Sequence, residues 1–140
     1  MSRIFWDTNL FIYLFEGSQQ FSPATKALRS KMLARGDQLL TSTFTLGEVL
    51  VKPLAKGDMA LFRTYEDAIT KSALVIPLNA LAARNYASIR LDRTVKPPDA
   101  IQLACAASAG VDLFVTNDDH LKGKQVPGIQ FIVPLDRVPI

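Results

Sequence analysis

The sequence predicts an α/β fold in which a parallel β-sheet lies between layers of helices. Short apolar runs alternate with longer amphipathic stretches along the whole chain, and this alternation favours a parallel sheet with helices on both faces. The chain has 140 residues, of which 49% are hydrophobic and 21% are charged. This composition is typical of a folded domain with a buried core and excludes a disordered chain. We therefore expect residues 1–140 to form one domain.

The expected strands are short apolar runs that end at polar or turn-forming residues. The first run, Ile-Phe-Trp, is too short for a helix and stops abruptly at Asp-Thr-Asn. The later runs are similarly short. In order, the expected strands cover residues 4–6, 38–41, 73–76, 112–116 and 129–133.

The expected helices begin at capping residues and stop at glycine or proline. The first helix runs over residues 10–15, with Asn9 as its N-cap and Gly17 as its stop. The second begins at Ser22, carries proline in its first turn, and ends at the Arg-Gly pair of residues 35–36.

The four later helices are predicted from the same signals. In order, they run from Thr43 or Thr45 through Glu48, from Asp58 to about residue 71, from Asn79 to about residue 90, and from Pro97-Pro98 to Gly110. Pro53 must stop or kink the first of these four, because proline cannot complete the helical hydrogen-bond pattern.

Composition excludes several kinds of site. The chain has one cysteine, Cys105, and one histidine, His120. It can therefore form neither an internal disulfide nor a zinc site with several Cys or His ligands. Any bound metal must be held mainly by oxygen. No apolar run has the length of a membrane span or the pattern of a signal peptide, so we expect a cytoplasmic protein without a membrane partner.

Four acidic residues follow expected strands or lie on expected helices, and they are the candidates for a functional site. Asp7 directly follows the first expected strand and Asp118 follows the fourth, and either could simply belong to a turn. Glu48 lies on a helix that is apolar nearly all round, where it must reach the rim of the core or find a partner. Asp99 lies in the first turn of the last helix, where the helix dipole alone would favour it.

Together these acids predict a metal site. In a parallel sheet, function sits beyond the carboxyl ends of the strands, near the point where the strand order reverses. If the first and fourth strands are neighbours there, the four carboxylates converge and repel one another. Mg²⁺ or Mn²⁺ would relieve that repulsion, because these hard cations prefer carboxylate and water ligands. Such a site suits hydrolysis of a phosphodiester.

The charge balance fits a polyanionic substrate. The formal net charge is +3, and without the four acids nine acidic side chains face sixteen basic ones. Phosphate contacts dominate the affinity of proteins for nucleic acids. The basic residues nearest in sequence to Asp99 and Asp118 are candidates to hold phosphates, although the pattern favours a solvated surface lysine for any one of them taken alone. They are Lys96, Lys122 and Lys124.

Four motifs, in order and in approximate spacing, resemble the PIN-domain family, and within it the VapC-type toxin ribonucleases. They are Phe-Trp-Asp-Thr-Asn at residues 5–9, Ser42 followed by Gly-Glu-Val-Leu at 47–50, Pro-Asp-Ala-Ile-Gln-Leu-Ala at 98–104, and Val-Thr-Asn-Asp at 115–118. The match covers essentially the whole chain. It departs from many relatives at residues 120–121, where His-Leu replaces an acid followed by Phe.

The resemblance implies a three-layer α/β/α fold around a parallel sheet of four or five strands, and an endoribonuclease that uses Mg²⁺ or Mn²⁺ to hydrolyse RNA. By position, it implies that the catalytic and metal-binding acids are Asp7, Glu48, Asp99 and Asp118. Asn9 and Thr116 would orient Asp7 and a metal-bound water. The resemblance also implies a homodimer and an antitoxin protein that blocks the acidic groove.

Other functions remain to be weighed against the ribonuclease. A PIN-like module that binds RNA or protein without cutting is the main alternative. A phospho-acceptor signalling domain is disfavoured, because the first strand ends in a single acid and no acid follows the middle strands. A phosphatase of the haloacid dehalogenase type is disfavoured too, because it needs a second Asp at residue 9, where this chain has Asn.

Overall fold

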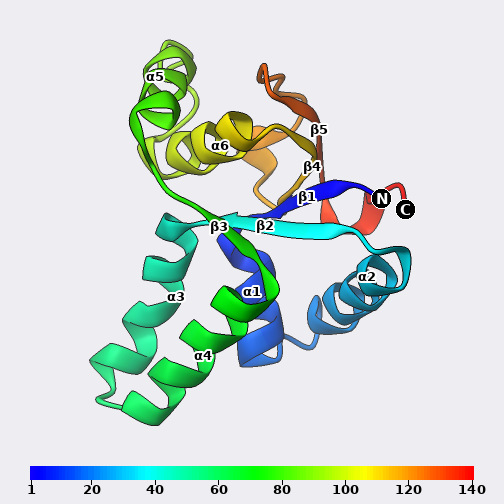
Figure 1. Ribbon diagram of the computed structural model, residues 1–140, viewed down its shortest axis with the longest axis vertical. Helices are drawn as coiled ribbons and strands as arrows, with labels where there is room; N and C mark the ends of the chain where they lie inside the picture. The colour runs from blue at the N-terminus through cyan, green and yellow to red at the C-terminus, as the bar shows by residue number, and fades with distance from the viewer.

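Five parallel strands form one central sheet in the computed structural model, which describes all residues 1–140 (Figure 1). The strand order is β3-β2-β1-β4-β5. The strands are β1 (Arg3–Trp6), β2 (Gln38–Ser42), β3 (Leu74–Ile76), β4 (Val111–Val115) and β5 (Ile129–Val133). The predictions of an α/β fold and of four to five parallel strands are confirmed.

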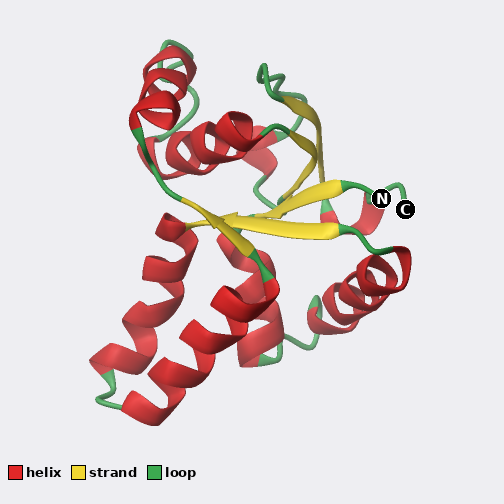
Figure 2. Ribbon diagram, in the orientation of Figure 1, coloured by secondary structure: helices red, strands yellow, loops and turns green.

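Helices cover both faces of the sheet and complete three layers (Figure 2). One face carries α1 (Thr8–Glu16), α2 (Ser22–Arg35), α3 (Thr43–Ala55) and α4 (Met59–Ser72). The opposite face carries α5 (Ala80–Ile89) and α6 (Pro97–Ala109). Two short 3₁₀ turns follow the last two strands, η1 (Asp119–Leu121) after β4 and η2 (Leu135–Arg137) after β5. No helix is long and apolar enough to cross a membrane.

The central strands are buried on both faces because their successive side chains enter two separate cores. Ile4 and Trp6 pack into the core under α1 to α4, whereas Phe5 packs into the core under α5 and α6. Phe5 stacks on Phe114 of the neighbouring strand, with ring centroids 5.0 Å apart. A strand that is buried on both faces reads as a continuous apolar run, which is why these short runs are visible in the sequence.

Three local features differ from the sequence-based expectation. The N-cap of α1 is Asp7, whose carboxylate accepts a hydrogen bond from the backbone N–H of Thr8, and not Asn9. The N-cap position of α2 is occupied by Phe21, so Ser22 lies inside the helix and its hydroxyl has no hydrogen-bond partner. Pro53 does not stop α3 at once: it lies in the last turn, and the helix ends two residues later at Ala55.

The strand order reverses between β1 and β4. The chain moves from β1 outward to β2 and β3, and then crosses to the other side of β1 to form β4 and β5. Trp6 lies opposite Val115 in this parallel pair, so the residues that follow each strand are neighbours in space. This is the switch point at which ligands bind in open parallel sheets.

Candidate active site

Asp7 forms the buried centre of the site at the carboxyl end of β1. Only 7% of the residue is exposed. Its Oδ2 accepts a hydrogen bond from Oγ1 of Thr116 at 2.7 Å. Its Oδ1 accepts hydrogen bonds from the backbone N–H of Thr8 at 2.8 Å and from Nε2 of Gln102 at 3.1 Å. Three donors from three segments therefore fix this carboxylate in one orientation.

Gln102 of α6 links Asp7 to the start of α3. Its Nε2 lies 2.6 Å from Oγ1 of Thr45 and 3.1 Å from Oγ1 of Thr8, and its Oε1 accepts a hydrogen bond from the hydroxyl of Ser42. Gln102 is only 2% exposed. Because buried polar groups are costly unless they are hydrogen-bonded, this network locks the loop after β1, the end of β2 and α6 together.

Glu48 reaches the site from α3 but is not buried. Its side chain lies on the exposed side of the helix, whereas the buried side carries Thr45 and Val49. Oε1 of Glu48 accepts a hydrogen bond from Oγ1 of Thr8 at 2.6 Å. The helix is not buried all round, since Val51 is 64% exposed, and Glu48 finds its partner in the hydroxyl of Thr8.

Asp99 and Asp118 form a second, partly exposed acidic pair beside Asp7. Burial raises the pKa of Asp99 to about 7, and the nearby carboxylates of Asp118 and Asp7 add to the increase. Burial also acts to raise the pKa of Asp118, but hydrogen bonds from the backbone and ring of His120 and from Asp99 outweigh it and leave that pKa lowered. Below about pH 7, Asp99 therefore holds the proton that Asp118 does not.

The pKa of Asp7 is also affected by this acidic pair. Burial raises the pKa of Asp7 above its ordinary value, the hydrogen bonds from Thr116, Thr8 and Gln102 oppose that increase, and the charge of Asp118 adds to it. Because Asp118 acts to raise the pKa of both Asp7 and Asp99, the three carboxylates are close enough to interact strongly. As they stand, however, no three His, Cys, Asp or Glu side chains already enclose a position for a metal ion.

The two polar residues expected to support the acids differ in placement. Thr116 is buried and contacts Asp7 directly, and its hydroxyl also accepts a hydrogen bond from the backbone N–H of Asp118 at 3.0 Å. Asn9 is exposed on α1 and its side chain forms no hydrogen bond within the protein. Asp119, which adjoins Asp118 in the sequence, is exposed at the start of η1.

The three candidate lysines also differ. Lys96 and Lys122 are exposed and form no ion pair. Lys124 donates hydrogen bonds to Oδ2 of Asp92 at 2.8 Å and to Oγ1 of Thr94 at 2.6 Å. Its ammonium is therefore tied to the loop before α6.

Sequence reasoning missed the network around Gln102. The residue lies inside one of the recognised motifs, but nothing in the pattern shows that its amide turns toward Asp7. The hydrogen bond from Oγ1 of Thr8 to Glu48 was also missed, as was the contact of His120 with Asp118, whose Oδ1 lies 2.9 Å from the ring Nδ1. The usable signal is that Gln102 is a polar residue in a run of Ala and Leu.

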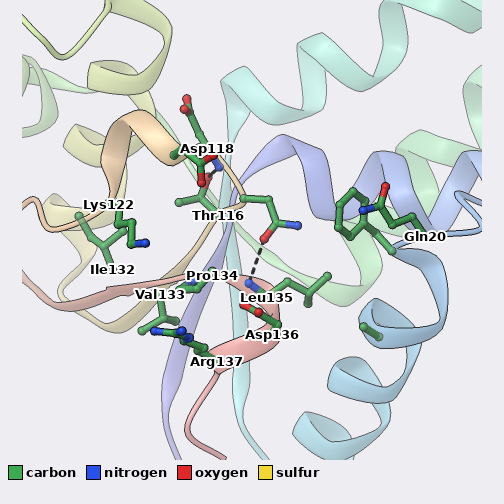
Figure 3. Close-up of a pocket in the computed structure, with 14 residues that line it drawn as sticks. Gln20, Thr116, Asp118, Lys122, Ile132, Val133, Pro134, Leu135, Asp136 and Arg137 are labelled. Atoms are coloured by element: carbon green, nitrogen blue, oxygen red, sulfur yellow. Dashed lines mark hydrogen bonds between the residues drawn. The ribbon is translucent and has the colours of Figure 1, made fainter.

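A cavity of about 620 Å³ adjoins the acidic group. Thr116 and Asp118 lie at its edge nearest the acids, and η2 forms part of its wall (Figure 3). Lys122 and Arg137 lie on one side of it and Gln20 on the other.

The fold and the site together define a three-layer α/β protein whose acidic residues gather at the switch point of a parallel sheet. The sequence matches the family model of the PIN domain over residues 4–126. The chain therefore belongs to the PIN-domain family. A comparison with curated proteins found no significant match.

Several solved structures share this fold. VapBC2 from Rickettsia felis bound to a promoter DNA fragment has a TM-score of 0.73 at 14% identity and covers 94% of this chain and 98% of that one. DNA-bound VapBC from Salmonella typhimurium has a TM-score of 0.70 at 21% identity and covers 96% and 99%. A toxin–antitoxin complex from Klebsiella pneumoniae has a TM-score of 0.64 at 23% identity and covers 93% and 99%.

Proposed function

We propose that residues 1–140 act as one nuclease domain, an endoribonuclease that hydrolyses RNA phosphodiester bonds with the help of Mg²⁺ or Mn²⁺. The single observation that carries the proposal is the mutual effect of Asp7, Asp99 and Asp118 at the switch point. Burial and the nearby Asp118 and Asp7 raise the pKa of Asp99 to about 7. Acidic groups whose pKa values are perturbed in this way cluster at functional sites.

The donor set suits a hard divalent cation. Asp7, Asp99 and Asp118 offer carboxylate oxygens, and Glu48 joins them through Thr8. The carboxylates do not enclose an ion as they stand, which fits a cation such as Mg²⁺ that keeps several of its own waters. When bound, the ion would neutralise charge on the phosphodiester and lower the pKa of a water. Asp7, Glu48, Asp99 and Asp118 would hold it.

The protein's own contribution is to fix charges before the substrate arrives. Thr116, Thr8 and Gln102 hold Asp7 rigidly, so little reorganisation is needed during the reaction. Asp99, with a pKa of about 7, can lose or gain a proton near neutral pH. Asn9 is exposed on α1, and its free side chain would orient a water. The exposed ammonium groups of Lys96 and Lys122 suit phosphate contacts. Lys124 can contribute only if it leaves Asp92.

We further propose that the protein is the toxin of a VapBC-type pair, that it forms a homodimer, and that an antitoxin protein covers its acidic site. The support is the similarity in fold to toxin–antitoxin complexes. Large apolar side chains that are exposed on α3 and α4 also favour a protein partner, because exposed apolar surface often marks an interaction site. They are Val51, Leu54 and Met59.

The test is cleavage of a mixed panel of structured and single-stranded RNAs. Wild-type protein is assayed with Mn²⁺ and with EDTA, beside Asp7→Asn purified in the same way. Cleavage that requires Mn²⁺ and is lost in Asp7→Asn supports the proposal and excludes a contaminating ribonuclease. Absence of cleavage over the whole panel, with RNA still bound, refutes the proposal and favours the alternative of an RNA- or protein-binding PIN-like module.

A further inference from the structure

The cavity beside the acidic group carries features that the proposed chemistry does not use. It extends from Thr116 and Asp118 along β5 to η2 and to the start of α2. Its volume of about 620 Å³ lies within the range of about 300–1,000 Å³ that is common for small-molecule sites. Because Asp118 of the acidic group lies at one edge of the cavity, the cavity is open to a strand bound at the acids.

One side of the cavity carries two basic residues without acidic partners. Lys122 follows η1 and Arg137 ends η2, and both lie on the same side of the cavity in Figure 3. Neither forms an ion pair or a side-chain hydrogen bond, although Lys124 nearby is paired with Asp92. Two unpaired cations at the rim of an acidic site suit an anion that bridges from the acids into the cavity.

The opposite side of the cavity is suited to a flat, polar ring. Phe21 lines it and packs against Tyr13, with ring centroids 4.6 Å apart, so one aromatic surface is already held in place. Gln20 lies beside it with an exposed amide that forms no hydrogen bond within the protein. Aromatic side chains stack on nucleobases, and free amides can bond to their edges.

Asp118, Asp119 and Asp136 also line the cavity. Asp118 belongs to the acidic group, and Asp119 is exposed at the start of η1. Asp136 turns toward α2, since it also lines a smaller cavity with Leu28 and Lys31. In Figure 3 it lies beside Leu135, away from Lys122. An anion therefore has its place on the side of Lys122 and Arg137.

We propose that this cavity is a subsite for one nucleotide of a single-stranded RNA, next to the phosphate that lies at the acidic group. Lys122 and Arg137 bind the phosphate of that nucleotide, and Gln20 reads the edge of its base beside the ring of Phe21. This inference rests on the proposed function. It adds Arg137, Gln20 and Phe21 to the residues that recognise the substrate and makes the cavity a determinant of base preference.

The test measures binding of short, unstructured RNA oligonucleotides to the full chain in EDTA, where metal-dependent cleavage cannot occur. Affinity is followed by fluorescence anisotropy over a range of salt concentrations. Each phosphate contact to a single strand contributes about 0.7 to the slope of log K against log salt. Because Lys122 and Arg137 bind the same phosphate, Lys122→Ala and Arg137→Ala should each lower the slope, and the double variant should lower it by about 0.7.

Arg84→Ala is the matched control, because Arg84 on α5 is exposed and unpaired like Arg137. It should leave the slope unchanged. Gln20→Ala should alter the ranking of oligonucleotides that differ in base composition and leave the slope unchanged. Thermal melting of each variant checks that its fold is intact.

Two results would overturn the subsite. If Lys122→Ala and Arg137→Ala give the same slope as Arg84→Ala, no phosphate is bound there and the cavity is left to a protein partner. If Gln20→Ala keeps the wild-type ranking, no base is read. Neither result depends on catalysis. If the Lys122 and Arg137 variants lower the salt slope but the wild type shows no Mn²⁺-dependent cleavage, the subsite stands and the nuclease proposal is refuted. If the wild type cleaves RNA but the variants keep the wild-type slope, the nuclease proposal stands and the subsite is refuted.

Discussion

Thr116 joins the ends of two strands through a single hydroxyl group. Its Oγ1 donates a hydrogen bond to Oδ2 of Asp7 at 2.7 Å and accepts one from the backbone N–H of Asp118 at 3.0 Å. Thr116 is 4% exposed, so water cannot readily replace either bond. The hydroxyl fixes the orientation of Asp7 at the end of β1 and the path of the chain that carries Asp118 beyond β4.

Thr116→Val should therefore damage both the fold and the site. The substitution keeps the shape but leaves Oδ2 of Asp7 and the backbone N–H of Asp118 each without a partner, which costs about 1–3 kcal/mol for a buried polar group. Urea denaturation measures the loss of stability. Thr116→Ser retains the hydroxyl and should recover most of both stability and activity. Equal stability and activity of Thr116→Val and Thr116→Ser would show that the hydroxyl plays no role.

The stability of the metal-free protein should fall as pH rises toward neutrality. Asp99 has a pKa of about 7 in the folded protein and of about 3.9 in an unfolded chain. The folded state therefore binds this proton more tightly, and its contribution is complete below about pH 4, declines between about pH 4 and pH 7, and is lost above. Melting temperatures in EDTA across this range should show the decline.

Asp99→Asn should remove that decline, because asparagine does not titrate. Asp67→Asn on the exposed surface of α4 is the control and should keep the wild-type profile. If Asp99→Asn and the wild type lose stability in parallel from pH 4 to pH 7, Asp99 is not the titrating group.

Mn²⁺ should stabilise the wild-type protein, and more strongly at higher pH. A ligand at a hundred times its dissociation constant adds about 2.7 kcal/mol to stability. Because Asp99 must release its proton to bind a cation, the apparent affinity should increase as pH rises through about 7. Calorimetric titration at several pH values measures this. An affinity that does not vary with pH would place the ion away from Asp99.

Gln102→Met should destabilise the protein although it keeps the volume of the side chain. The change removes the donor to Asp7 and the partners of Thr45 and Ser42, so we expect a loss of about 1–3 kcal/mol together with most of the cleavage activity. The same change at the exposed Gln130 of β5 is the control. Full stability of Gln102→Met would mean that water replaces the amide.

Glu48→Gln should hardly change the stability of the metal-free protein. Glu48 is exposed, and its hydrogen bond from Thr8 needs only an acceptor oxygen, which glutamine retains. A change within about 0.5 kcal/mol is normal for such a surface position. The stabilisation by Mn²⁺ should weaken in the same variant. A clear rise in the melting temperature in EDTA would reveal repulsion between Glu48 and the other acids.

The sequence was most informative where one local signal decides the structure. The strand at residues 129–133 was predicted with its observed ends, because an apolar run follows Pro and Gly. The meeting of Asp7 and Asp118 was also predicted, because both follow strands that flank the switch point. The N-cap of α1 was misplaced, because Asp, Thr and Asn stand in a row and any of them can cap a helix.

The sequence was least informative where packing decides. The role of Gln102 depends on which side of α6 faces β1 and β2. Because the helix is apolar on several sides, its sequence does not predict which side that is. The exposure of Glu48 follows from α3 extending beyond the sheet edge together with α4 (Figure 1), which no local pattern encodes. Arg137 belongs to a short 3₁₀ turn, and its approach to the cavity depends on the path of the chain after β5.

The distance along the chain between Asp7 and Thr116 also sets when the site can first exist. The two residues are separated by 109 positions, and domains are synthesised from the N-terminus. Asp7 is synthesised early, whereas its donor Thr116, which directly follows β4, is synthesised only after all six α-helices. A growing or truncated chain that lacks β4 cannot hold Asp7 in its working orientation. The order of synthesis therefore keeps the acidic site unassembled until the protein is nearly complete.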